Sequence, residues 1–129
     1  MKKSFILLTI VTSVGCTDPL IGNWNANELC EFGDCYVLPF ESEGITYSFD
    51  LVVNEDFTGT MSKTELSDTT TEVDTWELNI SIGDDGIYEF DRIHGDGDIY
   101  KINCTMNGKE LECVSVESES ESMTFEKAE

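Results

Sequence analysis

Apolar and polar residues alternate along most of the chain from Trp24 onward. Residues 76–82 place Trp, Leu, Ile and Ile at every second position, with Glu, Asn and Ser between them. Residues 47–53, 100–106 and 123–126 repeat this alternation. A period of two is typical of antiparallel strands with one buried face and one solvated face. No window of about 11 residues in this part carries a helical stripe, so the pattern predicts an all-β protein.

Clusters of Gly, Asn and Asp interrupt the alternating runs and mark turns. They place strands near residues 22–30, 35–41, 45–54, 57–66, 72–82, 87–94, 98–106, 110–117 and 122–127. About eight or nine consecutive strands favour an up-and-down antiparallel β-barrel or a sandwich. We expect the barrel, because closure removes the unpaired edges that a hydrophobic sheet otherwise exposes.

The same alternation selects the apolar side chains that face the candidate barrel interior. They are Trp24, Phe49, Leu51, Trp76, Leu78, Tyr88, Phe90, Tyr100 and Ile102. These side chains either line a ligand pocket or fill a solid core, and the sequence leaves both alternatives open. A cavity of about 300 Å³ or more would favour the pocket.

The N-terminus has the features of an export signal. Lys2 and Lys3 precede an apolar stretch, residues 5–11, which is too short for the roughly 20 residues of a membrane span. The stretch ends in Gly15-Cys16, which resembles the bacterial lipobox. This resemblance implies that residues 1–15 are removed and that Cys16 carries a diacylglycerol. The alternative is ordinary signal cleavage that leaves Cys16 as a free thiol.

The number of cysteines agrees with a lipid on Cys16. The chain has five Cys, and lipidation of one leaves Cys30, Cys35, Cys104 and Cys113, an even set for an oxidising compartment. Four cysteines allow three pairings, and we favour the two local ones. A zinc site would require closer Cys spacing or His partners.

The turn expected between the predicted strands at residues 98–106 and 110–117 supports the pairing of Cys104 with Cys113. A turn at Asn107-Gly108 would set Cys113 too far from Cys104 for easy bridging. A turn at Gly108-Lys109 places Cys104 opposite Cys113, and Gly as its first residue suits a type II′ turn. A four-residue loop, 107–110, gives the same pairing.

The length of 129 residues suits one folded domain. We divide the chain into a signal peptide at residues 1–15, a lipid-anchored tether at 16–21 and a barrel domain at 22–129.

All 27 Asp and Glu follow the signal, whereas two of the seven basic residues belong to it, so the mature chain has five basic residues and a net charge of −22. Such a surface repels phosphate backbones, which excludes a nucleic-acid partner. The acidic repeat at 117–122 is expected to be a solvated loop.

Short motifs of the mature chain resemble those of bacterial lipocalin-like lipoproteins. Gly22-Asn23-Trp24 matches the Gly-x-Trp of the family's first strand, and residues 56–60, 103–111 and 123–126 also resemble the group. The resemblance implies a barrel in which Trp24 closes one end. In the family an Arg near the last strand packs on this Trp. Here Lys127 occupies that region, and the sole Arg is Arg92.

Residues that could carry catalysis are scarce. His94 is the sole His, and no nucleophile pattern surrounds it, so we expect an ordinary loop residue and no enzyme. Asp96 and Asp98 offer oxygen ligands for Ca²⁺, but an EF-hand loop starting at Asp96 would require Glu where Asn107 stands. We therefore expect no cofactor and no built metal site, with weak surface binding of Ca²⁺ as an alternative.

These observations predict a monomeric, lipid-anchored protein of the cell envelope, at the outer membrane or the cell surface. Its partners would be the membrane, through the lipid on Cys16, and a small apolar ligand inside a lipocalin-like barrel, unless the barrel is a purely structural envelope module. The alternative is a surface interaction protein whose acidic exterior binds a basic partner without an internal ligand.

Overall fold

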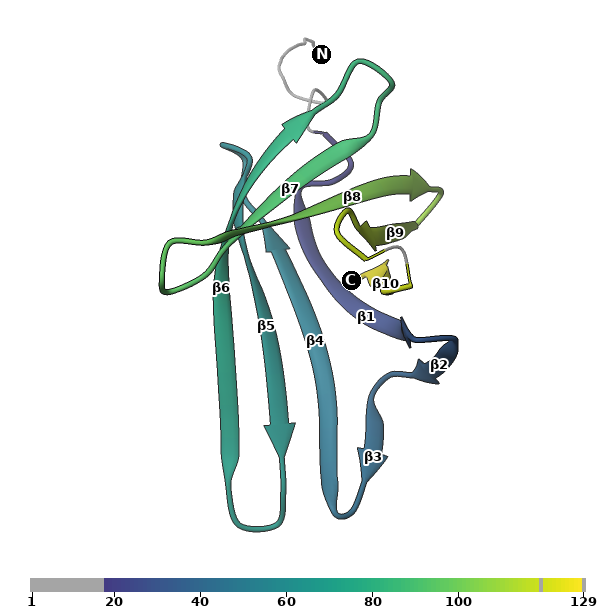
Figure 1. Ribbon diagram of the computed structural model, residues 1–129, viewed down its shortest axis with the longest axis vertical. Coiled ribbons are helices and arrows are strands. Elements are labelled where there is room, and N and C mark those ends of the chain that lie inside the picture. Colours follow the sequence, from purple (N-terminus) through teal and green to yellow (C-terminus); the bar gives the residue numbers. More distant parts are fainter. Residues whose placement is uncertain (1–17, 119, 129) are drawn as a thin grey trace, which may run out of the picture.

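The computed structural model describes residues 18–118 and 120–128, which form an antiparallel β-barrel (Figure 1). Its strands are β1 (Gly22–Glu31), β2 (Asp34–Val37), β3 (Phe40–Ser42), β4 (Ile45–Val53), β5 (Thr58–Leu66), β6 (Thr71–Ile82), β7 (Tyr88–Ile93), β8 (Ile99–Asn107), β9 (Glu110–Ser115) and β10 (Ser122–Lys127). Their order in the sheet is β2-β1-β10-β9-β8-β7-β6-β5-β4-β3. Additional pairing of β1 with β4 closes eight strands into a barrel, which confirms the predicted fold class. The described residues contain no helix long and apolar enough to cross a membrane.

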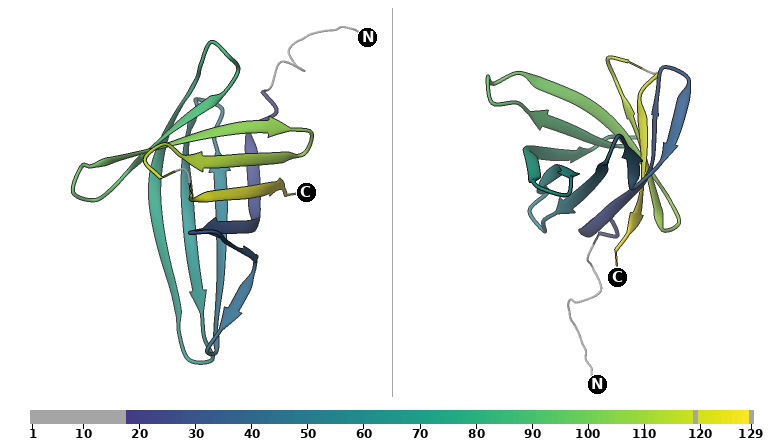
Figure 2. Two further views of the ribbon diagram at one scale, coloured as in Figure 1. Left: turned by 45° about the vertical axis from the view of Figure 1, so that its right-hand side comes forward. Right: turned by 90° about the horizontal axis from the view of Figure 1, so that it is seen from below.

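The barrel is closed along only part of the seam between β1 and β4. Residues 22–25 of β1 pair with residues 50–53 of β4. Farther along, β1 pairs with β2 and β4 pairs with β3, so the two barrel strands separate (Figure 2). The single strand predicted at residues 35–41 is therefore wrong. It divides at Leu38-Pro39, because Pro39 has no N–H for a ladder and because the two halves join different strands.

The interior holds all nine side chains predicted to face it. Phe49, Trp76 and Tyr100 are partly buried against the core, and the other six are buried. Several further core residues were not in the predicted set, namely Leu20, Ala26, Leu38, Val53, Met61, Ile80, Leu111 and Phe125. Pairs across the strands, such as Phe90 with Ile102 and Leu111 with Phe125, show that one face of each strand supplies this core.

Both local disulfides are present. Cys30 bonds Cys35 across β1 and β2, and Cys104 bonds Cys113 across β8 and β9. Asn107 pairs with Glu110, which places the turn at Gly108-Lys109 as expected. The positive φ of 65° at Gly108 agrees with the type II′ conformation. The second disulfide lies inside the barrel, where Cys104 is fully buried.

One end of the barrel is capped by the segment before β1. The Trp24 indole N–H donates to the Leu20 carbonyl at 2.8 Å, and Leu20 is fully buried. The Lys127 ammonium lies 4.8 Å from the centre of the Trp24 ring and donates to two carbonyls of residues 19–21, each at 2.6 Å. Residues 18–21, which the sequence placed in the tether, thus form the cap, and Lys127 occupies the position on Trp24 that the resemblance assigns to Arg.

Candidate functional site

The opposite end, where β1 and β4 separate, is called the open end from here on. Inside it is a cavity of about 70 Å³, lined among others by Leu29, Met61, Arg92, Tyr100, Ser115 and Met123. This volume is well below the roughly 300 Å³ of a typical ligand pocket. Side chains therefore fill most of the interior.

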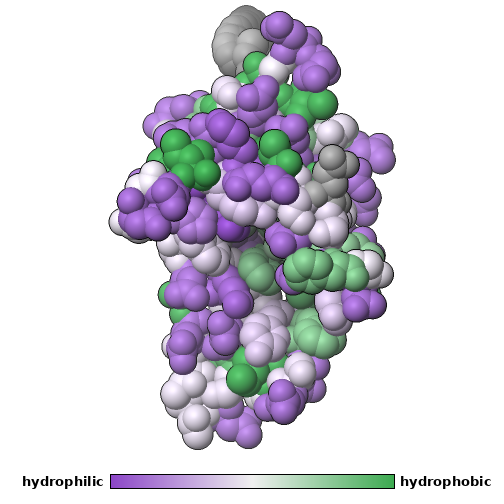
Figure 3. Space-filling model, in the orientation of Figure 1, coloured by the Kyte–Doolittle hydropathy of each residue, from purple (hydrophilic) through white to green (hydrophobic). Residues whose placement is uncertain are grey.

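A larger space adjoins this cavity. The open-end groove, of about 220 Å³, lies between β1 and β2 on one side and β3, β4 and β5 on the other. Its lining is mostly apolar and aromatic, and it consists of Leu29, Glu31, Tyr36, Leu38, Phe40, Tyr47, Phe49 and Lys63. Leu29 lines both spaces. Most of the face in Figure 3 is hydrophilic, but pale and green surface borders a hollow at mid-height.

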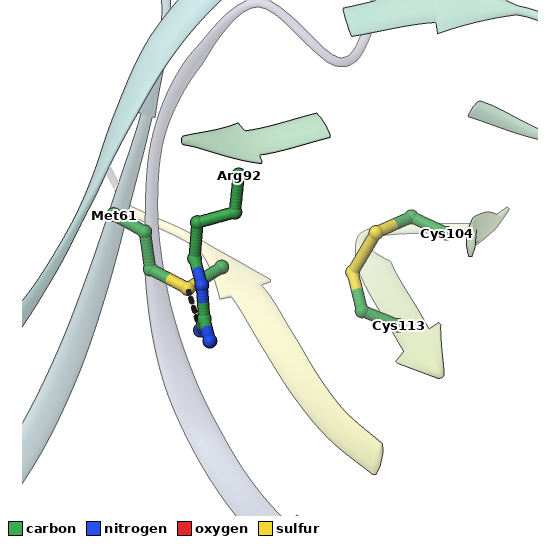
Figure 4. Close-up of a disulfide and its surroundings, with 4 residues drawn as sticks. All are labelled: Met61, Arg92, Cys104 and Cys113. Atoms are coloured by element: carbon green, nitrogen blue, oxygen red, sulfur yellow. Dashed lines mark hydrogen bonds between the residues drawn. A yellow bond between two sulfur atoms is a disulfide. The ribbon is translucent and has the colours of Figure 1, made fainter. Parts of the chain in front are cut away.

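Arg92 of β7 projects into the open end. Its guanidinium carbon lies 4.9 Å from the centre of the Trp76 ring and 4.6 Å from that of Tyr100, so both rings make cation–π contacts with it. One terminal nitrogen, Nη1, points to the Met61 sulfur at 3.9 Å (Figure 4). The Nε atom is buried and has no hydrogen-bond partner. Burial lowers the pKa of Arg92, whereas electrostatic interaction with Tyr100 and Glu121 acts to raise it. The guanidinium stays charged, because arginine is not deprotonated in proteins.

Tyr100 is held against Arg92 by a chain of hydrogen bonds. Its hydroxyl donates to the Glu121 carboxylate at 3.0 Å and accepts from the Ser115 hydroxyl at 2.7 Å. The Ser115 oxygen in turn accepts from the Ser118 N–H at 3.2 Å. The prediction of a solvated acidic loop is thus wrong for Glu121, which is partly buried and whose carboxylate accepts the Tyr100 hydroxyl.

A second cation, Lys63, lines the open-end groove. Its ammonium lies 3.3 Å from the Glu65 carboxylate and 5.8 Å from the centre of the Tyr47 ring. Within residues 18–118 and 120–128 the other ion pair joins Lys101 to Asp91, so neither of the two pairs includes Arg92.

The remaining candidates form no site. His94 lies beside Tyr100, with 6.2 Å between ring centres, and no described nucleophile is hydrogen-bonded to it. The Asp96 carboxylate accepts the Asp98 N–H at 2.9 Å in an exposed turn. Over the described part of the chain, one group of possible metal ligands comes together, Glu28 with Cys30 and Cys35, but the two sulfurs are bonded to each other. The signal peptide and Cys16 lie outside the described residues.

The fold defines this chain as an eight-stranded antiparallel β-barrel with one capped and one open end. No protein-family model matches the chain, and a search of curated proteins finds no significant match. The sequence predicted Trp76 and Tyr100 inside the barrel, but the inward position of Arg92 was not predicted. The usable signal was the alternation itself, because Arg92 follows Tyr88 and Phe90 at the same period of two.

Proposed function

We propose that this protein is an exported, lipid-anchored barrel of the cell envelope that binds a small, largely apolar molecule at its open end. The observation that carries this proposal is that the cavity and the apolar groove at the open end share Leu29 in their linings. Barrel mouths are common places for ligand sites. The cavity of about 70 Å³ holds only a small part of such a ligand, so the groove of about 220 Å³ must hold the rest.

The position of the cap supports an orientation for the proposed anchor. The Asp18 carboxylate is bound by the Tyr88 hydroxyl at 2.8 Å and by the Leu20 N–H at 2.9 Å. Thr17 alone separates Asp18 from Cys16, and a residue spans at most about 3.5 Å. A lipid on Cys16 would therefore hold the capped end at the membrane and turn the open end away from it.

Binding can be tested with the Cys16→Ser mature protein and the neutral fluorophore N-phenyl-1-naphthylamine. We expect saturable binding of one probe per protein. Leu29→Trp fills the junction of cavity and groove and should weaken binding by about tenfold or more. Val73→Trp, at a position 56% exposed on β6, is the matched control and should bind like the parent. No saturable binding, or equal binding by a folded Leu29→Trp variant, would contradict the proposal.

The anchor can be tested in the native host with a labelled fatty acid. We expect the label to enter the protein and Cys16→Ser to abolish both labelling and membrane attachment. Thr17→Ser is the control that should keep both. Membrane attachment that survives Cys16→Ser would contradict lipidation at this residue.

A second candidate function is the binding of a basic protein partner, favoured by the tip of the β1–β2 hairpin. Phe32 is 76% exposed there, between Glu31 and Asp34, on a turn closed by the Cys30–Cys35 disulfide. A rigid, exposed aromatic residue among carboxylates would fit a partner surface that has a hydrophobic pocket surrounded by basic residues. A photo-crosslinker at position 32 should capture a basic envelope protein that one at position 73 does not. Equal capture at both positions would contradict this function.

A further inference from the structure

We propose that Arg92 binds a carboxylate, so that the ligand of the open end is a small amphiphile with a carboxylate head and an alkyl tail. This inference rests on the proposed function and adds the chemical class of the ligand. The tail would lie in the open-end groove, and the head would lie in the cavity beside the guanidinium.

Arg92 has hydrogen-bond donors for which the described residues supply no strong acceptor. A guanidinium has five N–H donors and no acceptor. Its contacts here are two aromatic rings, which attract the positive charge, and a sulfur atom, which is a weak acceptor. The buried Nε has no partner. A carboxylate would supply two strong acceptors in the planar geometry that guanidinium groups recognise.

Arg92 makes no direct ion pair within residues 18–118 and 120–128, although the protein is very acidic. The chain has 27 Asp and Glu, yet neither ion pair in the described part of the chain includes Arg92. Glu121, the carboxylate that acts on Arg92 electrostatically, is engaged by the Tyr100 hydroxyl. A partly desolvated charge that makes no direct ion pair is destabilising. Glu121, which lines the same cavity, offsets only part of this cost, because burial has the larger effect on Arg92. An anionic ligand would remove this cost on binding.

The space at the open end consists of a small cavity beside Arg92 and a larger groove. Liquid water occupies about 30 Å³ per molecule, so a cavity of about 70 Å³ has room for a compact head group of a few atoms. The groove that adjoins it at Leu29 is larger and is lined by Phe40, Phe49 and other apolar side chains. The guanidinium thus lies on the smaller space, and the larger space extends from Leu29 along apolar side chains.

The test compares decanoate with decanol, which has the same tail and no charge, by calorimetric titration of the Cys16→Ser protein. About 0.15 M NaCl limits repulsion by the acidic exterior to a Debye length of about 8 Å. We expect the parent to bind decanoate about tenfold more tightly than decanol, because hydrogen bonds between charged groups are stronger than those to a neutral hydroxyl. Arg92→Gln should lose this preference and still bind decanol.

Lys101→Gln is the matched control, because it removes one positive charge from an exposed ion pair on the neighbouring strand and should keep the preference. A folded Arg92→Gln variant that keeps the preference, or a parent that binds both molecules equally, overturns the inference while the proposed function stands. Binding of neither molecule overturns both. Decyl sulfate is the third probe, and tighter binding of it than of decanoate would overturn the assignment of a carboxylate.

Discussion

At the scale of single residues, the capped end depends on a few polar side chains that meet over Trp24. Lys127 donates to the backbone of residues 19–21, and Tyr88 donates to Asp18. These bonds hold Leu20 in the core although it precedes the first strand. Burial lowers the pKa of Lys127, opposed by the nearby Asp18 charge. These hydrogen bonds therefore join the segment before β1 to β7 and β10.

Tyr88 leads to a prediction about alkaline stability. Burial, followed by the hydrogen bond and the negative charge of Asp18, raises the pKa of Tyr88 from 10.0 to about 12. Between these values the unfolded chain loses the phenol proton while the folded chain keeps it, so the stability that this group contributes is complete below about pH 10 and is lost as the pH rises toward 12. Urea unfolding across this range should show a steeper loss of stability for the parent than for Tyr88→Phe. Equal slopes would contradict the prediction, and Tyr36→Phe is the control for the removal of a phenol.

At the scale of elements, residues close together in the sequence determine the conformations of the hairpin turns. The turns of residues 32–33 and 43–44 both have two residues at positive φ, as type I′ turns require. In the stretch 56–60, the Asp56 carboxylate accepts from the Thr58 hydroxyl and N–H, which lowers the pKa of Asp56. The next residue must be glycine, because a Cβ at Gly59 on β5 would collide with the Val52 carbonyl oxygen on the paired strand β4.

The two disulfides should differ in what they contribute. Loop-closure entropy gives each bond about 2–3 kcal/mol. The Cys104–Cys113 bond also fills part of the core, with both residues buried, whereas Cys35 is exposed. Cys104→Ala/Cys113→Ala should therefore lower the free energy of unfolding by more than Cys30→Ala/Cys35→Ala does, because it adds a cavity to the lost cross-link. Denaturant unfolding of the two double variants measures this difference, and equal losses would refute it.

At the scale of the whole molecule, the barrel combines an acidic exterior with cations that line its interior. Lys63, Arg92 and Lys127 all contact inward-facing aromatic rings, although the mature chain is expected to have only five basic residues against 27 acidic ones. The exterior carries a large excess of like charge, which opposes the compact state. This charge governs how the folded molecule responds to salt.

Thermal stability should rise with NaCl between about 0.01 M and 0.15 M, because the Debye length falls from about 30 Å to about 8 Å. Melting curves followed by circular dichroism would measure the shift. CaCl₂ at equal ionic strength is the control, since a much larger response to Ca²⁺ that Asp96→Asn removes would indicate a specific site. A melting temperature that does not respond to NaCl would show that the charges are spaced well enough not to matter.

The sequence by itself determined the all-β class, the inward face of each long strand and both disulfide pairs. These features depend on a period of two and on turn chemistry, which neighbouring residues express without help from the rest of the chain. The inward placement of Phe49, Trp76 and Tyr100 could be predicted for this reason, as could the facing of Cys104 and Cys113.

Only the tertiary structure decided where the barrel is open and what lies there. The division of residues 35–41 into β2 and β3 depends on the separation of β1 from β4, strands that are far apart in the sequence. Leu20 is buried because closure of the barrel created an end that it could cap. Arg92 meets Trp76 and Tyr100 through the registers of β7 with β6 and with β8, which set Tyr100 directly opposite Arg92. Contacts between distant strands depend on closure and register, which no local pattern of residues encodes.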